Sequence, residues 1–113
     1  MQPESPALIW DARRAAGRVL EFVADRSWDD YQQDVMLRSA VERQFQIIGE
    51  ALNRLSKADP ATADRITDLA RIVAFRNVLV HGYAQIDDAL VWEVASTRVP
   101  DLSVVLAGLL DGP

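Results

Sequence analysis

Apolar residues recur at steps of three and four positions along nearly the whole chain, which is the pattern of amphipathic α-helices. The first such segment begins at Ser5 and Pro6 and continues to about Asp25. We expect Ser5 to cap this helix, because its hydroxyl can accept a hydrogen bond from a free N–H of the first turn. Pro6 suits that turn, since its missing N–H is not needed there. The apolar positions of the segment are Leu8, Ala12, Ala15, Val19 and Phe22.

The longest periodic segment predicts a second helix from about Tyr31 to Ser56, preceded by a turn at residues 28–30 that supplies its cap. Asp59 followed by Pro60 is typical of a helix cap and a first-turn proline, so we expect a short extra helix there. The apolar stripe of the long helix consists of Leu37, Val41, Phe45, Ile48, Leu52 and Leu55.

A third helical region begins near Thr67 or Asp68 and continues to His81. We expect Gly82 to end it, because glycine most easily adopts the left-handed conformation that follows a last helical turn.

The last helical region is predicted at residues 89–110, after a short connection at residues 83–86 and a cap at Asp87 or Asp88. Pro100 is expected to kink or break it, since proline cannot donate a helical hydrogen bond. The region is apolar on more than one face. We therefore expect one face in the core and another against a second copy of the chain.

The predicted fold is all-α, because no segment alternates with a period of two for long enough to form a strand. Short connections favour an antiparallel four-helix bundle with a short extra helix or a proline-kinked last helix. A length of 113 residues predicts that residues 1–113 form one domain.

Composition narrows the classes of function. The chain has no cysteine, which excludes disulfides and thiolate chemistry. Residues 1–6 lack the basic opening of a signal peptide, and no apolar run approaches the about 20 residues of a membrane span, so we expect a cytoplasmic protein with no membrane association. The formal net charge is −5, whereas proteins that bind nucleic acid broadly are normally basic. Any RNA contact would therefore depend on a local basic patch, a second copy or a partner.

Most kinds of active site have no support in the sequence. A single histidine and no cysteine give no metal site, and the glycines stand too far apart for a phosphate-binding loop. A serine triad would need the same histidine and lacks a Gly-x-Ser-x-Gly segment. We therefore predict no metal and no cofactor.

The one remaining candidate for chemistry is residues 75–83, where an otherwise apolar helix carries three polar groups at its C-terminal end, next to a tyrosine. At about 100° per residue, Asn77 and His81 share one flank, and the long Arg76 side chain can reach toward both. Such a set permits RNA cleavage without a metal: a histidine removes the proton of the attacking 2′-hydroxyl, and a guanidinium stabilises the charge of the transition state. With one histidine in each chain, the base and acid roles would be divided between two copies in a dimer.

A structural interpretation of the same residues remains open. His81 would be a cation at a helix end, and Arg76 would pair with Asp68, Asp87 or Asp88. From spacing alone, this arrangement is the more common one.

The pattern Arg-x4-His-x-Tyr, here Arg76, His81 and Tyr83, resembles the signature of the HepT-like branch of the HEPN superfamily. Residues 41–52 resemble its long-helix segment, and residues 86–94 resemble the segment beyond its motif. The resemblance covers roughly residues 31–110. The chain departs from the pattern at residue 84, where an alanine stands in place of a larger, often aromatic residue.

The resemblance implies a homodimeric, metal-independent endoribonuclease that acts on RNA as the toxin of a type VII (HepT/MNT) toxin–antitoxin system. Its two motifs would meet in a cleft at the dimer interface, with Arg76 and His81 as catalytic residues and Asn77 as the polar residue that the motif favours after its arginine. The implied partner is a minimal nucleotidyltransferase antitoxin that transfers AMP to the motif tyrosine, here Tyr83.

Arg71 is a further candidate for phosphate contact, although a surface role is the simpler interpretation. Two other functions remain open. One is a non-catalytic dimeric HEPN protein that binds a nucleotidyltransferase, which the acidic composition favours. The other is a helical adaptor without any role in nucleic-acid chemistry.

Overall fold

The computed structural model describes residues 1–81 and 86–111, and within these ranges the chain forms α-helices and no strand. The predicted all-α fold is therefore confirmed. None of these helices is both long enough and apolar enough to cross a bilayer. The helices are α1 (Ser5–Val23), α2 (Trp28–Gln33), α3 (Val35–Ala58), α4 (Pro60–Ala63), α5 (Leu69–His81), α6 (Asp88–Thr97) and α7 (Val99–Asp111).

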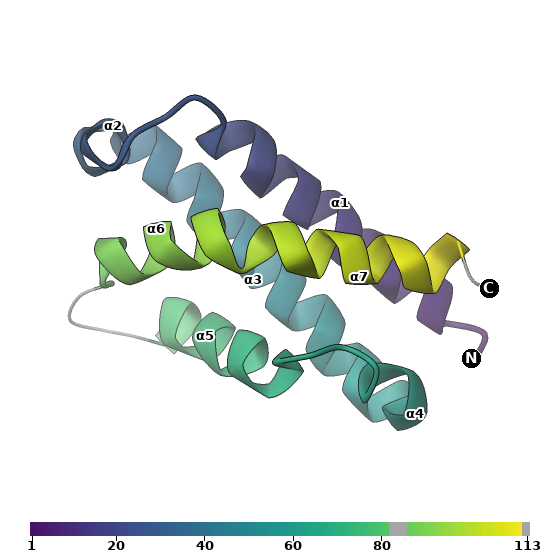
Figure 1. Ribbon diagram of the computed structural model, residues 1–113. Helices are drawn as coiled ribbons and strands as arrows, with labels where there is room; N and C mark the ends of the chain where they lie inside the picture. Colours follow the sequence, from purple (N-terminus) through teal and green to yellow (C-terminus); the bar gives the residue numbers. More distant parts are fainter. Residues whose placement is uncertain (82–85, 112–113) are drawn as a thin grey trace.

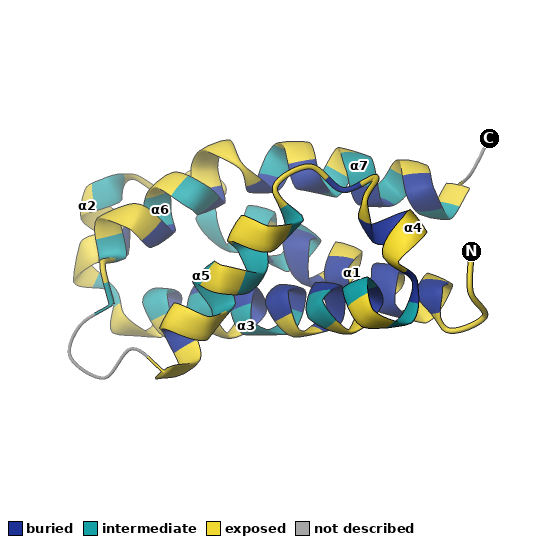
Figure 2. Cartoon of the chain, turned by 90° about the horizontal axis from the view of Figure 1, so that it is seen from below, coloured by how far each residue is buried: buried dark blue, intermediate teal, exposed yellow. Residues whose placement is uncertain are grey.

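The bundle is built from α1, α3, α5 and the nearly continuous pair α6–α7, with successive members running in opposite directions (Figure 1). α1 packs along α3, and α7 packs against α1. α5 packs on α3 and lies apart from α6 and α7 along most of its length. In the view from below, the buried sides of α1, α3 and α7 face one another, whereas α5 carries exposed residues along much of its length (Figure 2). α5 is thus the least enclosed of the long helices.

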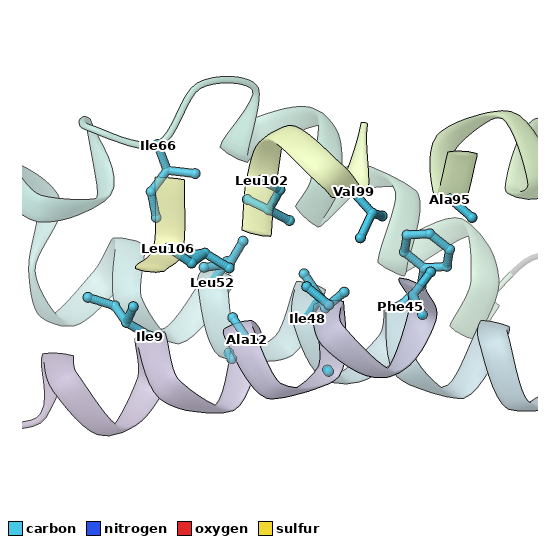
Figure 3. Close-up of a cluster of buried hydrophobic side chains, with 14 of the residues drawn as sticks. Ile9, Ala12, Phe45, Ile48, Leu52, Ile66, Ala95, Val99, Leu102 and Leu106 are labelled. Carbon is cyan, nitrogen blue, oxygen red and sulfur yellow. The ribbon is translucent and has the colours of Figure 1, made fainter. Parts of the chain in front are cut away.

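The core lies between α1, α3 and α7, whose side chains point into the same space (Figure 3). Ile48, Leu52 and Leu106 have no exposed surface, and neither do the small Ala12 and Ala16 of α1. Burial of one large aliphatic side chain contributes about 1.5–3 kcal/mol. Packing of these faces, more than helix propensity, therefore stabilises the bundle.

A buried carboxylate ties the start of the chain to α4. Oδ2 of Asp59 accepts hydrogen bonds from the Gln2 N–H at 2.9 Å and from the hydroxyls of Ser5 and Thr62, each at 2.7 Å. Oδ1 accepts one from the Thr62 N–H at 3.2 Å. These hydrogen bonds hold the pKa of Asp59 well below its ordinary value, and the bond from the Gln2 N–H has the largest effect. The prediction that Asp59 caps a short helix before Pro60 is confirmed.

The predicted cap of α1 was wrong. Ser5 is already helical, and its hydroxyl donates to Asp59 rather than accepting from the first turn of α1. Glu4 is the N-cap, and its side chain makes no capping hydrogen bond. The helix begins one residue earlier than predicted, so Ser5 lies inside its first turn, and its hydroxyl donates to the Asp59 carboxylate, far away in the sequence.

The predicted helix from Tyr31 is in fact divided at Asp34. Ser27 caps α2 in a capping box with Asp30, so residues 28–30 are the first turn of α2 rather than a turn before a helix. Asp34 ends α2 and caps α3 by accepting a hydrogen bond from the Leu37 N–H at 3.1 Å.

Aromatic packing accompanies this division of the helix. Tyr31 is fully buried, with its ring centroid 6.2 Å from that of Trp28 and 5.3 Å from that of Trp92 in α6. The change of direction at Asp34 thus lets α2 place an aromatic side chain on α6.

The last helical region is broken where the sequence predicted. α6 is capped by Asp87, whose Oδ1 accepts from the Leu90 N–H at 3.2 Å, and α7 begins at Val99 with Pro100 in its first turn. The predicted helix stop at Gly82 and most of the predicted connection lie outside the described residues.

Candidate functional site

The segment that the sequence singled out forms the second half of α5. α5 packs on α3, and the ring of Phe75 meets that of Phe45 edge to face at 5.1 Å between centroids. Leu79 is the buried residue of α5. The helix nevertheless keeps large apolar side chains in solvent: Val78 is 52% exposed and Val80 is 42% exposed. The apolar surface of α5 is therefore larger than the area that α3 covers.

α3 and α5 approach each other very closely at Gly49 and Arg76. A Cβ atom added at Gly49 would lie 2.1 Å from Cβ of Arg76 and 2.6 Å from its Cγ. Both distances are far inside van der Waals contact, so a side chain at position 49 would require one of the helices to move. The base of the Arg76 side chain thus lies directly against the backbone of α3.

The guanidinium of Arg76 is held beside Asn77. Its Nη1 donates a hydrogen bond to Oδ1 of Asn77 at 2.9 Å. Its Nε is buried and has no hydrogen-bond partner among the described residues. The rest of the guanidinium fork keeps donors for another acceptor, and a fork of this kind suits the oxygens of a phosphate.

His81 is the last residue of α5, and its side chain is exposed. It makes no hydrogen bond or ion pair within residues 1–81 and 86–111. The sequence placed Asn77 and His81 on one flank of the helix, and both are exposed. The structure therefore brings Arg76 and Asn77 into direct contact and presents His81 on the same helix, one turn beyond Asn77.

The ion pairs that would have made Arg76 a structural residue are made by other groups. Asp68 pairs with Arg98 at 3.5 Å, and Asp88 pairs with Arg38 at 3.7 Å. Asp87 caps α6. Within the part of the chain that the structure describes, Arg76 forms no ion pair with any of these three carboxylates.

Arg71 lies elsewhere on α5. It lines a pocket of about 540 Å³ between α5 and α6–α7, together with Asp68 and Arg98. Neither Arg76 nor His81 lines this pocket. Among the candidate residues, the structure thus places only Arg71 at this pocket. The apolar lining comes from Phe45, Ile48, Ile66, Ile72, Phe75, Leu90, Val94, Val99, Leu102 and Val105.

A second group of charged and polar residues lies where α2, α3 and α6 meet. Burial, and then the charges of Glu42 and Asp88, raise the pKa of Tyr31, whose hydroxyl is buried with no hydrogen-bond partner among the described residues. Burial and the Asp88 charge also raise the pKa of Glu42. No group of three or more His, Cys, Asp and Glu side chains that could hold a metal ion occurs in the described ranges.

The sequence reasoning missed Gly49 as part of the site. A lone glycine in the middle of a long helix costs about 1 kcal/mol relative to alanine, so close packing is one reason to look for at such a position. The sequence does not distinguish Gly49 from Gly17 and Gly108, against which nothing packs within 4 Å of an added Cβ atom. The residue against which Gly49 packs could not be read from the pattern of α3 alone.

Comparison with known proteins places the chain among ribonuclease-related sequences. Residues 12–108 match the family model described as "Ribonuclease HepT-like". A protein of Methanocaldococcus jannaschii named "Putative RNase MJ1380" is 32% identical over 96 residues, which are 85% of this chain and 87% of the relative. "Putative RNase MJ0125" of the same organism is 24% identical over 96 residues, 85% of this chain and 82% of the relative.

A bacterial relative shows the same similarity. "Putative RNase TTE0752" of Caldanaerobacter subterraneus subsp. tengcongensis is 29% identical over 84 residues, which are 74% of each chain. No solved structure gives a significant match. Because the family model covers most of α1 and the whole of α2 to α6, and because a relative is 32% identical over most of both chains, this chain belongs to the ribonuclease HepT-like family.

Proposed function

We propose that this protein is a metal-independent endoribonuclease whose catalytic residues are Arg76 and His81. One observation carries the proposal: α5 presents Arg76, Asn77 and His81 beside exposed valines, with Arg76 bound to Asn77 at 2.9 Å, while Asp68 and Asp88 pair with other arginines. Membership of the HepT-like family and the names of the relatives support RNA as the substrate.

The proposed reaction uses the two copies of a homodimer. His81 of one copy removes the proton of the 2′-hydroxyl, and the resulting oxygen attacks the adjacent phosphorus. The guanidinium of Arg76, oriented by Asn77, donates to the phosphate oxygens as their negative charge increases. His81 of the other copy protonates the departing 5′-oxygen. The products are a 2′,3′-cyclic phosphate and a free 5′-hydroxyl.

The exposed apolar surface of α5 supports a homodimer with the motif at its interface. Val78 and Val80 flank Leu79 in the last turns of the helix and remain in solvent in the single chain. A second copy covering them would bring two Arg76 and two His81 side chains near each other. A paired site would also concentrate positive charge locally in a protein whose formal net charge is −5.

The proposed biological role is the toxin of a type VII (HepT/MNT) toxin–antitoxin system in the cytoplasm. Its partner would be a minimal nucleotidyltransferase antitoxin that transfers AMP to Tyr83. Tyr83 follows His81 by two positions and lies outside the described residues. AMP at that position would add a phosphate charge and a bulky nucleotide next to His81 and would block access of RNA.

The experiment compares purified wild type with His81→Ala on total cellular RNA in excess EDTA. We expect the wild type alone to cleave. Restoration of activity by a divalent ion after loss in EDTA would contradict the metal-independent mechanism.

If neither protein cleaves, intact mass shows whether AMP is already attached. An unmodified and inactive wild type would favour the second candidate, a non-catalytic dimeric HEPN protein that binds a nucleotidyltransferase. The net charge of −5, which disfavours binding of RNA, is the observation that supports this candidate.

A further inference from the structure

We propose that Gly49 is a positioning residue for Arg76: the missing side chain at Gly49 lets α5 approach α3 closely enough to fix the Arg76 guanidinium in place. The inference rests on the proposed ribonuclease function, in which the location of that guanidinium decides the rate.

The contact at Gly49 differs from that of other glycines in the helices. A Cβ atom at Gly49 would lie 2.1 Å from Cβ of Arg76, whereas a Cβ atom at Gly17 or Gly108 would meet nothing within 4 Å. All three lie inside helices, where glycine is the least favourable residue except proline. Packing therefore excludes alanine at Gly49, while the surroundings of Gly17 and Gly108 would admit it.

The Arg76 side chain is fixed along its length by this approach. Its Cβ and Cγ lie against Gly49, its Nε is buried, and its Nη1 is bound to Asn77. A long side chain that is free in solution would have to be ordered during the reaction, whereas one already held in position would not. Loss of the contact at Gly49 would release the base of the side chain, and with it the guanidinium.

The location of α5 depends mainly on α3, because α5 lies apart from α6 and α7 along most of its length. A side chain at position 49 would push α5 outward with little resistance from the other side of the helix. A displacement of about 1 Å is enough to lower a catalytic rate by about a hundredfold. The close approach at Gly49 thus affects the rate of the proposed RNA cleavage as well as the packing of α5 on α3.

The test compares Gly49→Ala with the matched controls Gly17→Ala and Gly108→Ala. In single-turnover cleavage of a short RNA, we expect Gly49→Ala to lower the maximal rate by at least about tenfold and to change the half-saturating RNA concentration by less than about threefold. Both controls should retain the wild-type rate. A purely structural role for Gly49 would lower the melting temperature and leave the rate of the folded protein unchanged, which would overturn the proposal.

A second readout does not depend on activity. In a ¹H–¹⁵N spectrum, the Nε–Hε signal that disappears in Arg76→Lys belongs to Arg76, and we expect it to shift or broaden in Gly49→Ala but not in Gly17→Ala. An unchanged signal in Gly49→Ala would overturn the proposal. If the wild type does not cleave RNA, the proposed function fails, and this signal alone decides whether Gly49 positions Arg76.

A third variant covers the case in which Gly49→Ala does not fold. Arg76→Gly removes the Cβ atom that a methyl group at position 49 would strike. We therefore expect the double variant Gly49→Ala/Arg76→Gly to fold as well as Arg76→Gly alone. Failure of the double variant to fold would show that contact with Arg76 is not what requires a glycine.

Discussion

Polar residues at two places in this fold differ in whether the chain itself supplies their hydrogen-bond partners. Asp59, where α1 meets α4, is buried, and both of its carboxylate oxygens accept hydrogen bonds from the same chain. At the end of α5, Arg76 keeps donors available, and His81 is exposed without a partner among the described residues. The first group is satisfied within one chain, whereas the second keeps hydrogen-bonding groups that the described residues leave without partners.

The apolar residues around the two groups show the same difference. Leu55 and Ala63, which are close to Asp59 in the sequence, are buried, whereas Val78 and Val80 beside His81 are exposed. Exposed large apolar side chains also occur on the other long helices, at Trp10, Met36 and Val104. Polar groups that a fold satisfies internally stabilise it, and polar groups left available on an apolar surface are expected to act on a ligand or a second copy. The predictions below test this distinction.

The largest effect is expected from Arg76. Arg76→Ala should lower the second-order rate constant for RNA cleavage by about 1000-fold, because the donors that stabilise the transition state are lost. Arg76→Lys should restore little, since an ammonium cannot reproduce the paired donors of the guanidinium. Circular dichroism should show wild-type helicity in both variants. A collapse of the fold in Arg76→Lys would mean that Arg76 is structural, like Asp59.

The next effect concerns the exposed apolar surface of α5. Val78→Asp should yield a monomer in sedimentation velocity, because burial of an unpaired carboxylate in an apolar interface is unfavourable. RNA cleavage should fall by about 100-fold or more, since a single chain has one histidine for two proton transfers. Met36→Asp is the matched control, since Met36 is 80% exposed at the start of α3. A dimer that survives Val78→Asp would place the interface elsewhere.

Substitution of Asp59, in contrast, should lower stability and leave RNA cleavage unchanged. Asp59→Asn replaces one acceptor oxygen with an NH₂ donor. At the place of Oδ2 this donor would face those of Gln2, Ser5 and Thr62, and at the place of Oδ1 it would face the Thr62 N–H, so the melting temperature should fall by several degrees in either orientation. Cleavage by the folded fraction should stay at the wild-type rate. A loss of cleavage without a loss of stability would contradict the structural role of Asp59.

The same carboxylate predicts a dependence of stability on pH. The pKa of Asp59 is lowered in the folded state, so its stabilising contribution is fully present above the unfolded-state pKa of about 3.9. That contribution is lost as the pH falls through the lower pKa of the folded state. In thermal melts below about pH 4, wild type should therefore lose more stability than Asp59→Asn. Equal losses would show that other carboxylates dominate.

The smallest effect is expected from Arg71, which lines the pocket beside α5 and lies apart from Arg76. Arg71→Ala should leave the maximal cleavage rate within about twofold and should weaken RNA binding uniformly across sequences, as for a single phosphate contact. The logarithmic dependence of binding on salt should become shallower by about one unit. A loss as large as that of Arg76→Ala would place Arg71 in the active site.

The sequence predicted the elements that depend on local signals. Helical periodicity indicated the bundle, and Pro100 and Asp59 marked a break and a cap that the structure contains. The division at Asp34 was missed, because neither glycine nor proline marks it and the packing of Tyr31 on Trp92 accompanies it. Tertiary contacts of this kind leave no local signature.

For the candidate site, too, the local spacing could be predicted from the sequence and the tertiary contacts could not. Spacing placed Asn77 and His81 on one flank of a helix, but it could not decide between an ion pair and a free guanidinium at Arg76. Which of the two occurs depends on the partners of Asp68 and Asp88, and both pair with arginines far away in the sequence. The contact with Gly49 could not be predicted either, because it depends on which face of α3 meets α5.

The most direct test of a structural role for Asp59 and a catalytic role for His81 compares His81→Ala with Asp59→Asn in two assays on the same preparations. One assay is the thermal melt, and the other is RNA cleavage in EDTA, expressed for each mole of folded protein. We predict that His81→Ala melts like wild type and does not cleave, while Asp59→Asn melts at a lower temperature and cleaves at the wild-type rate. Cleavage by His81→Ala, or its failure to fold, would contradict the assignment of chemistry to the end of α5.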